Sequence, residues 1–277
     1  IAHSVANALV GNKRDAIVLE MHIPAAVIVF NKETLFTFTG AVTSATLDNE
    51  TVYSNQPIIV NAGSKLTFNA PVNGARIYLA VHGGFKSKKG RLQKNDVLLT
   101  AQSFNYHFEG VGQLHALTTG WTANTGEFYR SNIIRCIQGP NFNVLSKKEI
   151  EQFENKRFEI DLQSNRMGFR IKSDPIFHTI TPELLSTAVT RGTLQLTPAG
   201  QLIVLMADHQ TTGGYPRIGT VISADMSSLA QMPIGSSFGI KWIDIQEAER
   251  LLLQQETNLQ QLENACKFRL QEYFSEK

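Results

Sequence analysis

This sequence of 277 residues lacks the features that mark several common classes of protein. Its two cysteines, Cys136 and Cys266, stand far apart and fit neither a zinc site nor a disulfide framework. Lys and Arg number 26 against 24 Asp and Glu, and a net charge of +2 gives no reason to expect a nucleic-acid or membrane partner. No apolar run reaches the length of a membrane span, and no signal peptide is recognisable. We therefore expect a globular protein of the reducing cytoplasm that binds no metal.

The motifs of several catalytic families are also absent. There is no Gly-x-x-x-x-Gly-Lys-Ser/Thr loop for nucleotide phosphates, no Gly-x-Ser-x-Gly elbow and no His/Cys cluster with zinc spacing. No Met-Lys-Met-like segment is present to carry covalent biotin. If the reaction needs ATP or a biotin arm, another polypeptide supplies it, so we expect no cofactor bound by this chain itself.

Short β-rich runs separated by turn residues fill most of the chain. Many short strands at close spacing predict a barrel or sandwich rather than a parallel α/β sheet. In the first half, we expect a helix over residues 3–10 and strands over 16–23, 27–29, 35–39, 51–53, 57–60, 65–68, 75–81 and 96–99. In the second half, we expect strands over 131–137, 157–160, 168–171, 192–196, 202–206 and 218–222, with a helix over 147–153 that begins at a Ser146/Glu149 capping box.

The end of the chain differs in kind, because residues 243–274 contain neither Gly nor Pro. Apolar residues recur there at spacings of three and four, which predicts a helix with Leu252, Leu259 and Leu262 buried. Cys266 lies on the same stripe and is expected to be a buried small hydrophobe rather than a nucleophile. The expected domains are therefore 1–130 and 131–242, followed by a helical tail over 243–277.

The stretch from Asp208 to Arg217 carries the most reactive groups and lies between two apolar strands. Its paired glycines, Gly213 and Gly214, let the backbone approach a ligand and adopt positive φ. An ordinary tight turn whose Thr and Asp side chains cap their own backbone is the alternative. By residue type, Asp208 and His209 are candidate proton acceptors for catalysis.

A second candidate cluster comes just before the strand at residue 168. The planar guanidinium group of Arg166 offers several hydrogen-bond donors to a carboxylate or a carbonyl oxygen. The amide of Asn165 beside it can both donate and accept hydrogen bonds. In the alternative, Asn165 forms a turn and Arg166 pairs with a surface acid. The favoured interpretation of Gln138-Gly139-Pro140 is a turn at the end of a strand. The candidate catalytic residues are thus Asp208, His209 and Arg166, and the candidate substrate-binding residues are Asn165, Gln210, Thr211, Thr212, Gly213, Gly214, Tyr215 and Arg217.

The run Asp208-x-Gln-Thr-Thr-Gly-Gly-Tyr-Pro-Arg217 continues through Val221-Ile-Ser-Ala-Asp225 and Leu229-Ala-Gln231 to Pro233-Ile-Gly235. This pattern closely resembles the biotin-dependent carboxyltransferase family, formerly labelled allophanate hydrolase subunit 2. The family includes the C subunit of bacterial 5-oxoprolinase, the KipA-type proteins and the carboxyltransferase region of urea amidolyase. Further matching stretches are Ala6-Asn-Ala-Leu-Val-Gly-Asn12, Phe38-Thr-Gly-Ala41, Ala80-Val-His-Gly-Gly84, Gly139-Pro140, Asn165-Arg-Met-Gly168 and Gly192-Thr-Leu-Gln195.

The resemblance implies tandem cyclophilin-like β-barrel domains with a C-terminal helix. It also implies the C subunit of an ATP-dependent 5-oxoprolinase complex that opens 5-oxoproline to glutamate together with the A and B subunits, of which B is KipI-like. One alternative is a biotin-dependent carboxyltransferase subunit that acts on urea or a similar amide. Another is a non-catalytic KipA-like regulator that binds a KipI-like kinase inhibitor. As a 5-oxoprolinase subunit, the chain is not expected to be active alone.

Two parts of the family pattern are missing. The opening strand with its Gln-Asp-x-Gly-Arg pattern would stand before Ile1, and the chain starts without Met, so we expect residues upstream. The loop after Gly84, where the family usually carries Gly-Ser-Arg-Ser-Thr, is here only Phe85-Lys-Ser-Lys-Lys-Gly90. Substrate-binding residues expected in those two segments are left unassigned.

Overall fold

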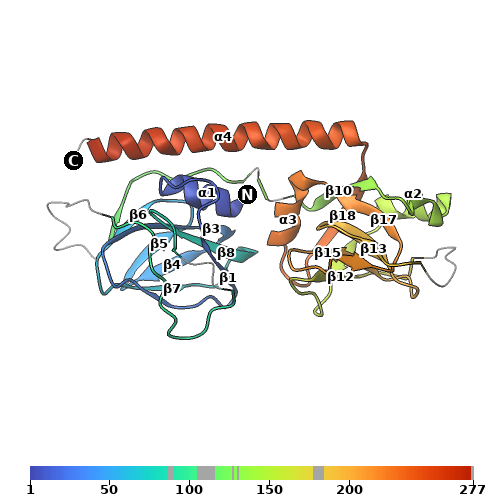
Figure 1. Ribbon diagram of the computed structural model, residues 1–277, viewed down its shortest axis with the longest axis horizontal. Helices are drawn as coiled ribbons and strands as arrows, with labels where there is room; N and C mark the ends of the chain where they lie inside the picture. The colour runs from blue at the N-terminus through green and yellow to red at the C-terminus, as the bar shows by residue number, and fades with distance from the viewer. Residues whose placement is uncertain (87–89, 105–115, 127, 130, 177–183, 276–277) are drawn as a thin grey trace. The chain divides into compact units, whose positions relative to one another are not determined.

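The computed structural model describes residues 1–86, 90–104, 116–126, 128–129, 131–176 and 184–275 (Figure 1). The chain divides into two compact units, one made of residues 1–128 and 256–277 and the other of residues 129–255. This division falls inside the last helix, so the C-terminal segment contributes to both units. The expected fold class, mainly β with a C-terminal helix, is confirmed.

The first unit contains two antiparallel sheets, with strand orders β1-β8-β3-β6-β9 and β2-β7-β4-β5. Phe36, Phe38 and Leu47 are among the buried side chains that pack between the strands, and helix α1 packs on β3 and β8. The elements are α1 (Ala2–Leu9), β1 (Leu19–His22), β2 (Ile28–Val29), β3 (Thr34–Val42), β4 (Ser44–Leu47), β5 (Glu50–Tyr53), β6 (Ile58–Val60), β7 (Lys65–Phe68), β8 (Asn73–Val81) and β9 (Ala116–Thr118).

The strands of the first unit differ from those expected in three places. One is β9, which lies where no strand was expected and pairs with β6. Residues 96–99 form no strand, and Val97 and Leu99 are 64% and 63% exposed. This short apolar run pairs with no described strand; the next residue, Thr100, forms an isolated bridge with Phe85. Strand β4 was not expected, although it alternates between half-buried and buried residues and pairs with both β5 and β7.

The second unit is a closed barrel with strand order β10-β17-β14-β15-β12-β11-β18. A separate two-stranded ribbon, β13–β16, also belongs to this unit. The capping box is confirmed, because Ser146 Oγ accepts a hydrogen bond from the Glu149 backbone N–H at 3.2 Å. The elements are β10 (Ile133–Gln138), η2 (Phe142–Val144), α2 (Lys147–Asn155), β11 (Phe158–Ile160), β12 (Gly168–Lys172), β13 (Thr187–Ala188), β14 (Thr193–Leu196), β15 (Leu202–Leu205), β16 (Thr212–Gly213), β17 (Arg217–Val221), η3 (Ser223–Asp225), α3 (Met226–Gln231) and β18 (Ser237–Trp242).

Helix α4 (Ile245–Ser275) confirms the expected C-terminal helix. Of the three leucines predicted to be buried, only Leu259 is, at 1% exposure; Leu252 is 36% exposed and Leu262 is half-buried, so the prediction is wrong for these two. The expected burial of Cys266 is confirmed, and burial raises the pKa of its thiol to about 12. A thiol with so high a pKa is a poor nucleophile.

Two ion pairs lie on the same side of α4 as its buried leucines. Arg14 Nε lies 2.7 Å from Glu263 Oε1, and Arg14 Nη1 lies 2.6 Å from Glu256 Oε2, so both glutamates face the first unit. Leu259 and Leu270 of the same helix are buried within this unit. Of the helices that the structure describes, none combines the length and the apolarity that crossing a membrane requires.

Candidate functional site

The loop between β15 and β17 is more than a tight turn. Its residues Thr212 and Gly213 form β16, which pairs with β13 through Ala188 and Thr187. The ribbon continues beyond this ladder, because the Val189 N–H donates to the carbonyl oxygen of Thr211 at 3.1 Å. The candidate loop therefore forms one strand of a short ribbon.

The ribbon covers a buried glutamine of the barrel wall. Leu194 and Leu196 of β14 belong to the barrel core, so Gln195 between them faces the other side of the strand. Gln195 is 1% exposed, and a Cβ atom at position 213 would collide with its Nε2 atom. Gly213 thus lies directly on the amide of Gln195, and the absence of a side chain at Gly213 makes this contact possible.

The expectation of positive φ at the paired glycines is wrong. Neither Gly213 nor Gly214 lies in the left-handed region. Gly213 belongs to a strand, and what it requires is close approach to Gln195. A Cβ at Gly214 would come within 3.4 Å of the Leu184 carbonyl oxygen and 3.5 Å of Ser186 Oγ, which is a milder constraint.

Arg217 joins the ribbon to the barrel. Its Nη1 donates to the Ala188 carbonyl oxygen at 2.9 Å, and its backbone N–H donates to Asn141 Oδ1 at 3.0 Å. The Gly139 N–H donates to the Ile218 carbonyl oxygen at 2.9 Å, and a Cβ at Gly139 would collide with the Arg217 carbonyl oxygen. The favoured interpretation of Gln138-Gly139-Pro140 is confirmed, because this turn ends β10 and packs against β17.

Arg166 and Asp208 form an ion pair at the end of strands β12 and β15. Arg166 Nε lies 2.7 Å from Asp208 Oδ2, and Nη2 donates to Oδ1 at 3.2 Å. Their side chains are 41% and 54% exposed. Asn165 Oδ1 accepts from the Met167 N–H at 2.8 Å, so Asn165 forms a turn. This is the alternative in which Arg166 pairs with a surface acid.

The ion pair affects both residues as candidates for catalysis. A hydrogen bond from Arg166 lowers the pKa of Asp208, so the carboxyl group is ionised at neutral pH but is a weaker proton acceptor. The guanidinium group in turn has donors occupied by that carboxylate. Each residue therefore occupies hydrogen-bonding groups of the other that a substrate would otherwise contact.

His209 has a different environment. Its Nδ1 lies 2.6 Å from the carbonyl oxygen of Gln210. Because a carbonyl oxygen can only accept, Nδ1 carries the proton, and Nε2 holds the lone pair when the ring is neutral. The imidazole is thus oriented by its own loop with an acceptor nitrogen left available.

The structure brings only some of the predicted site residues together. The Gln210 amide nitrogen lies 3.4 Å from the position that a Gly213 Cβ would occupy. Tyr215 is 44% exposed, and Thr211 and Thr212 are exposed. The prediction did not assign Gln195 to the site, although this residue ends the matching stretch Gly192-Thr-Leu-Gln195 and stands between two leucines that pack in the core.

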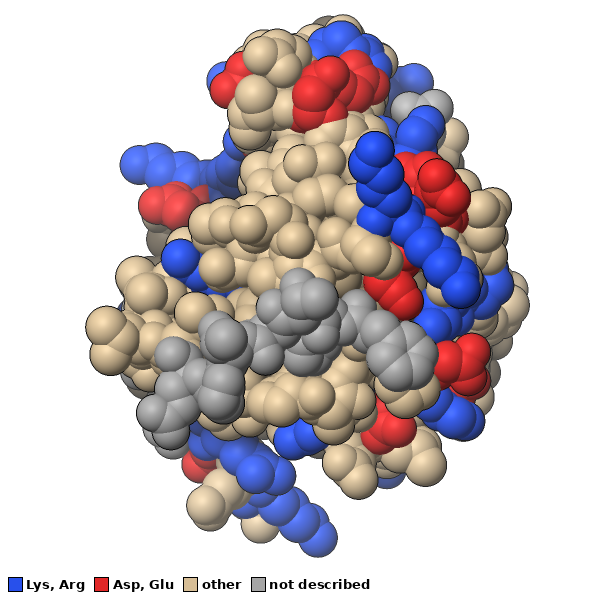
Figure 2. All heavy atoms as spheres, turned by 90° about the vertical axis from the view of Figure 1, so that its right-hand side faces the viewer, with Lys and Arg blue, Asp and Glu red and all other residues tan. Residues whose placement is uncertain are grey.

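The surface of the second unit shows no concentration of one charge on the face in view. Figure 2 shows Lys and Arg beside Asp and Glu at several places on this face, with other described residues between them. Among the described residues, no group of three or more His, Cys, Asp or Glu could hold a metal ion.

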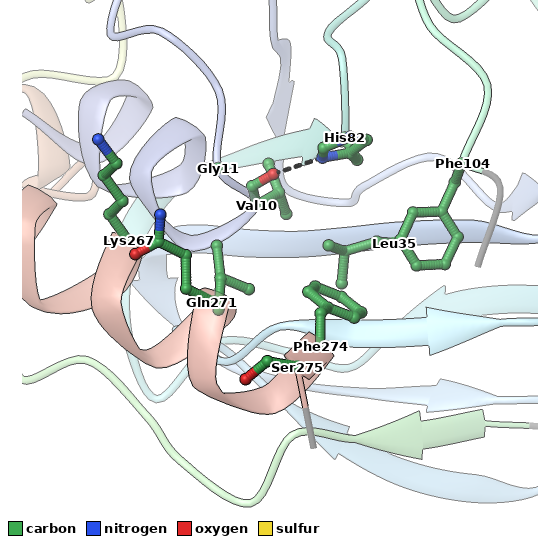
Figure 3. Close-up of a pocket in the computed structure, with 10 residues that line it drawn as sticks. Val10, Gly11, Leu35, His82, Phe104, Lys267, Gln271, Phe274 and Ser275 are labelled. Atoms are coloured by element: carbon green, nitrogen blue, oxygen red, sulfur yellow. Dashed lines mark hydrogen bonds between the residues drawn. The ribbon is translucent and has the colours of Figure 1, made fainter. Parts of the chain in front are cut away.

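A separate cavity of about 480 Å³ lies in the first unit (Figure 3). Phe104, Phe274 and Leu35 lie close together there, whereas the amine of Lys267 points away from them. His82 places its Nδ1 2.8 Å from the Val10 carbonyl oxygen. The cavity contains none of the predicted site residues; its lining consists of Val10, Gly11, Leu35, His82, Phe104, Lys267, Leu270, Gln271, Phe274 and Ser275.

Two asparagines connect α1 to the backbone beside this cavity. Asn12 donates to the Val81 carbonyl oxygen at 2.8 Å and accepts from the Gly83 N–H at 2.7 Å. Asn7 is fully buried and donates to the Ala16 carbonyl oxygen at 2.8 Å. The matching stretches 6–12 and 80–84 therefore form one hydrogen-bonded structure.

Comparison with known families and proteins gives consistent matches. The family described as carboxyltransferase domain, subdomain A and B, matches residues 1–91 and 88–242. The C subunit of Escherichia coli 5-oxoprolinase is 33% identical over 93% of this chain and 85% of its own length. The C subunit of Haemophilus influenzae 5-oxoprolinase is 29% identical over 95% of this chain and 86% of its length.

Solved structures share the fold at lower identity. The urea carboxylase of Kluyveromyces lactis superposes with a TM-score of 0.79 at 19% identity, over 94% of this chain and 26% of the urea carboxylase. The protein TTHA0988 superposes with a TM-score of 0.71 at 23% identity, over 88% of this chain. This chain spans 48% of TTHA0988, or about half of its length.

Proposed function

Because this chain belongs to the carboxyltransferase-domain family with subdomains A and B, we propose that it is the C subunit of an ATP-dependent 5-oxoprolinase complex. The observation that carries the proposal is the 33% identity to the C subunit of E. coli 5-oxoprolinase over nearly the whole of both chains. In this proposal the chain acts in the cytoplasm with the A and B subunits, of which B is KipI-like. The partners use ATP, and this chain binds no cofactor of its own.

Opening a lactam to an amino acid requires water to attack the ring carbonyl carbon and the C–N bond to break. The carbonyl oxygen needs hydrogen-bond donors as negative charge develops on it, and the attacking water must lose a proton. The loop between β15 and β17 offers groups of both kinds. Its donors include the amide of Gln210, beside backbone N–H groups of the glycine pair.

We assign the proton-accepting role to His209 ahead of Asp208. The Nε2 lone pair of His209 is left available by the bond between Nδ1 and the Gln210 carbonyl oxygen. The lowered pKa of Asp208 makes that carboxylate the weaker base. Arg166 and Asp208 then act as an electrostatic pair at the edge of the site, and Asn165 shapes the turn that presents Arg166. Thr211, Thr212 and Tyr215 contribute exposed polar groups for substrate binding.

A second candidate function is carboxyl transfer to urea or a similar amide, with biotin carried by another polypeptide. It is favoured by the 22% identity to the urea amidolyase of Lachancea kluyveri, which extends over 94% of this chain. The chain spans only 16% of that enzyme, so the remaining steps would belong to other parts or partners.

Reconstitution tests the proposal. The chain is co-expressed with candidate A and B subunits, and glutamate release from 5-oxoproline is measured with and without ATP. We expect release only from the complete, ATP-supplied complex, and His209→Ala should lower kcat by about 100-fold, the usual contribution of a general base. The matched control is His22→Ala, an exposed histidine of the first unit, which should leave the rate unchanged.

The other outcomes each contradict the proposal in a distinct way. Turnover by the isolated chain would show that the partners are not needed. Biotin-dependent carboxylation of urea without glutamate release would favour the second candidate. Stable association with a KipI-like protein without any turnover would identify the chain as a non-catalytic regulator.

A further inference from the structure

Gln195 is an anomaly in the barrel wall. Its side chain is 1% exposed, and its Nε2 atom has no hydrogen-bond partner among the residues that the structure describes. A buried amide donor without an acceptor destabilises a fold, because its bonds to water are lost and not replaced. A leucine or methionine would fill the same space without this cost, so the amide calls for an explanation in function.

The position of Gln195 is irregular as well as buried. The register between β14 and β17 shifts between Leu194 and Gln195, where Gln195 pairs with Arg217. Cross-strand partners project from the same face of a sheet. Arg217 contacts the ribbon through Ala188, and Gln195 contacts it through Gly213, so both side chains lie on the ribbon side of the barrel.

The ribbon that covers these two side chains is held by few bonds. The β13–β16 ladder has two residue pairs, Thr187 with Gly213 and Ala188 with Thr212. The barrel strand pairs beside it are longer, such as β12 with β15 over four residue pairs. Short, two-stranded elements are marginally stable by themselves. Moving β16 away from β14 therefore disrupts little structure and uncovers the Gln195 amide.

We propose that Gln195 binds the amide group of the substrate and that Arg217 beside it binds a carboxylate of the same molecule, once β16 moves off Gln195. This inference rests on the proposed function and names how the substrate is recognised. A carboxamide presents an N–H donor and a carbonyl acceptor side by side. A lactam ring holds its own N–H and C=O on the same side, so the two amides pair through two hydrogen bonds.

The two side chains together select one chemical class. Gln195 is neutral and suits a neutral amide, whereas the guanidinium group of Arg217 suits a carboxylate in a planar, two-bond geometry. Only one of its donors is committed to the Ala188 carbonyl oxygen among the side-chain bonds of the described residues. A lactam that bears a carboxylate uses both side chains, while urea uses only Gln195.

Ligand binding tests this inference directly. Binding of 5-oxoproline, 2-pyrrolidone and urea is measured by saturation-transfer NMR and calorimetry on the full chain and on the reconstituted complex. Gln195→Met keeps the side-chain length and removes both polar atoms. We expect it to weaken binding of 5-oxoproline and 2-pyrrolidone by about tenfold or more, the effect of losing buried hydrogen bonds. Arg217→Gln should weaken 5-oxoproline binding and leave 2-pyrrolidone binding unchanged.

The controls separate recognition from folding and from the proposed function. Gln163→Met alters an exposed glutamine of the same unit and should change neither binding nor melting temperature. Gln195→Met should melt no lower than the wild type, and Gln195→Leu provides a second apolar replacement if it does.

Wild-type binding and KM in both apolar variants would overturn the inference while 5-oxoprolinase activity stands. Loss of binding only in step with loss of folding would also overturn it. Turnover of urea alone, with weaker urea binding in Gln195→Met, would sink the proposed function and keep the amide-binding role.

Discussion

The second unit contains two Arg–Asp pairs with similar geometry and very different surroundings. Arg166 and Asp208 meet at the surface, where their side chains are 41% and 54% exposed. Arg135 and Asp225 meet where Asp225 is 1% exposed, and Asp225 Oδ2 also accepts from the Arg135 backbone N–H at 2.7 Å. Both carboxylates accept from two guanidinium nitrogens.

The difference shows that burial, rather than geometry, separates a structural ion pair from one available for function. Asp225 stands at the start of α3 and ties that helix to strand β10, and hydrogen bonding to it raises the pKa of Arg135. Water cannot replace this partner without opening the packing between α3 and the barrel. Asp208 and Arg166 remain hydrated, so either one can exchange its partner for a ligand at little cost.

Removing Asp225 should have the largest effect on stability. Asp225→Ala leaves the Arg135 guanidinium without its partner and should lower the free energy of unfolding by about 3–5 kcal/mol, the range for breaking a buried pair. Urea unfolding followed by circular dichroism measures this change. The matched variant is Asp208→Ala in the exposed pair. Equal losses in the two variants would show that burial does not distinguish them.

The sequence predicts much of the local structure of both units, because the causes are local. Ser146 and Glu149 stand three residues apart and make the capping box that begins α2. The β-rich runs and the helix over residues 245–275 follow from side-chain periodicity. The prediction failed at residues 96–99, where the short apolar run Val97-Leu98-Leu99 joins no strand. It also failed at Leu252, which lies on the apolar stripe of α4 and is 36% exposed.

The candidate site was harder to predict because its contacts are long-range. Arg166 and Asp208 are 42 residues apart, and their pairing appears only once β12 and β15 lie side by side. The burial of Gln195 depends on a ribbon formed by residues 187–188 and 212–213. A glutamine between two core leucines has the pattern of any solvent-facing strand residue, so the matching stretch Gly192-Thr-Leu-Gln195 gave no sign that its last residue is buried.

An intermediate effect is expected for the exposed pair on activity. Arg166→Lys keeps the charge but not the two-bond geometry, so Asp208 should be held less firmly. We expect the free energy of unfolding to change by less than about 1 kcal/mol, as for other exposed pairs. If the pair helps to orient the site loop, kcat/KM of the reconstituted complex should still fall severalfold. The control Lys172→Arg alters an exposed cation near Glu159 and should change neither quantity. Full activity in Arg166→Lys would remove this pair from the site.

The smallest effect is the pH dependence that the exposed pair contributes. Because Arg166 lowers the pKa of Asp208 in the folded state, the pair stabilises the fold at pH values above the unfolded pKa of about 3.9. This contribution is lost as the pH falls through the lower, folded pKa, and solvent screening keeps it below about 1 kcal/mol. NMR can follow the carboxyl carbon of Asp208 during an acid titration. We expect its titration midpoint to lie below about 3.9, the usual pKa of an unpaired Asp. In Arg166→Gln the midpoint should return toward that value, and high salt should reduce the difference between the two proteins. A midpoint that is the same with and without Arg166 would show that the contact does not persist in solution, and the contrast with the buried pair would then be one of formation rather than of strength.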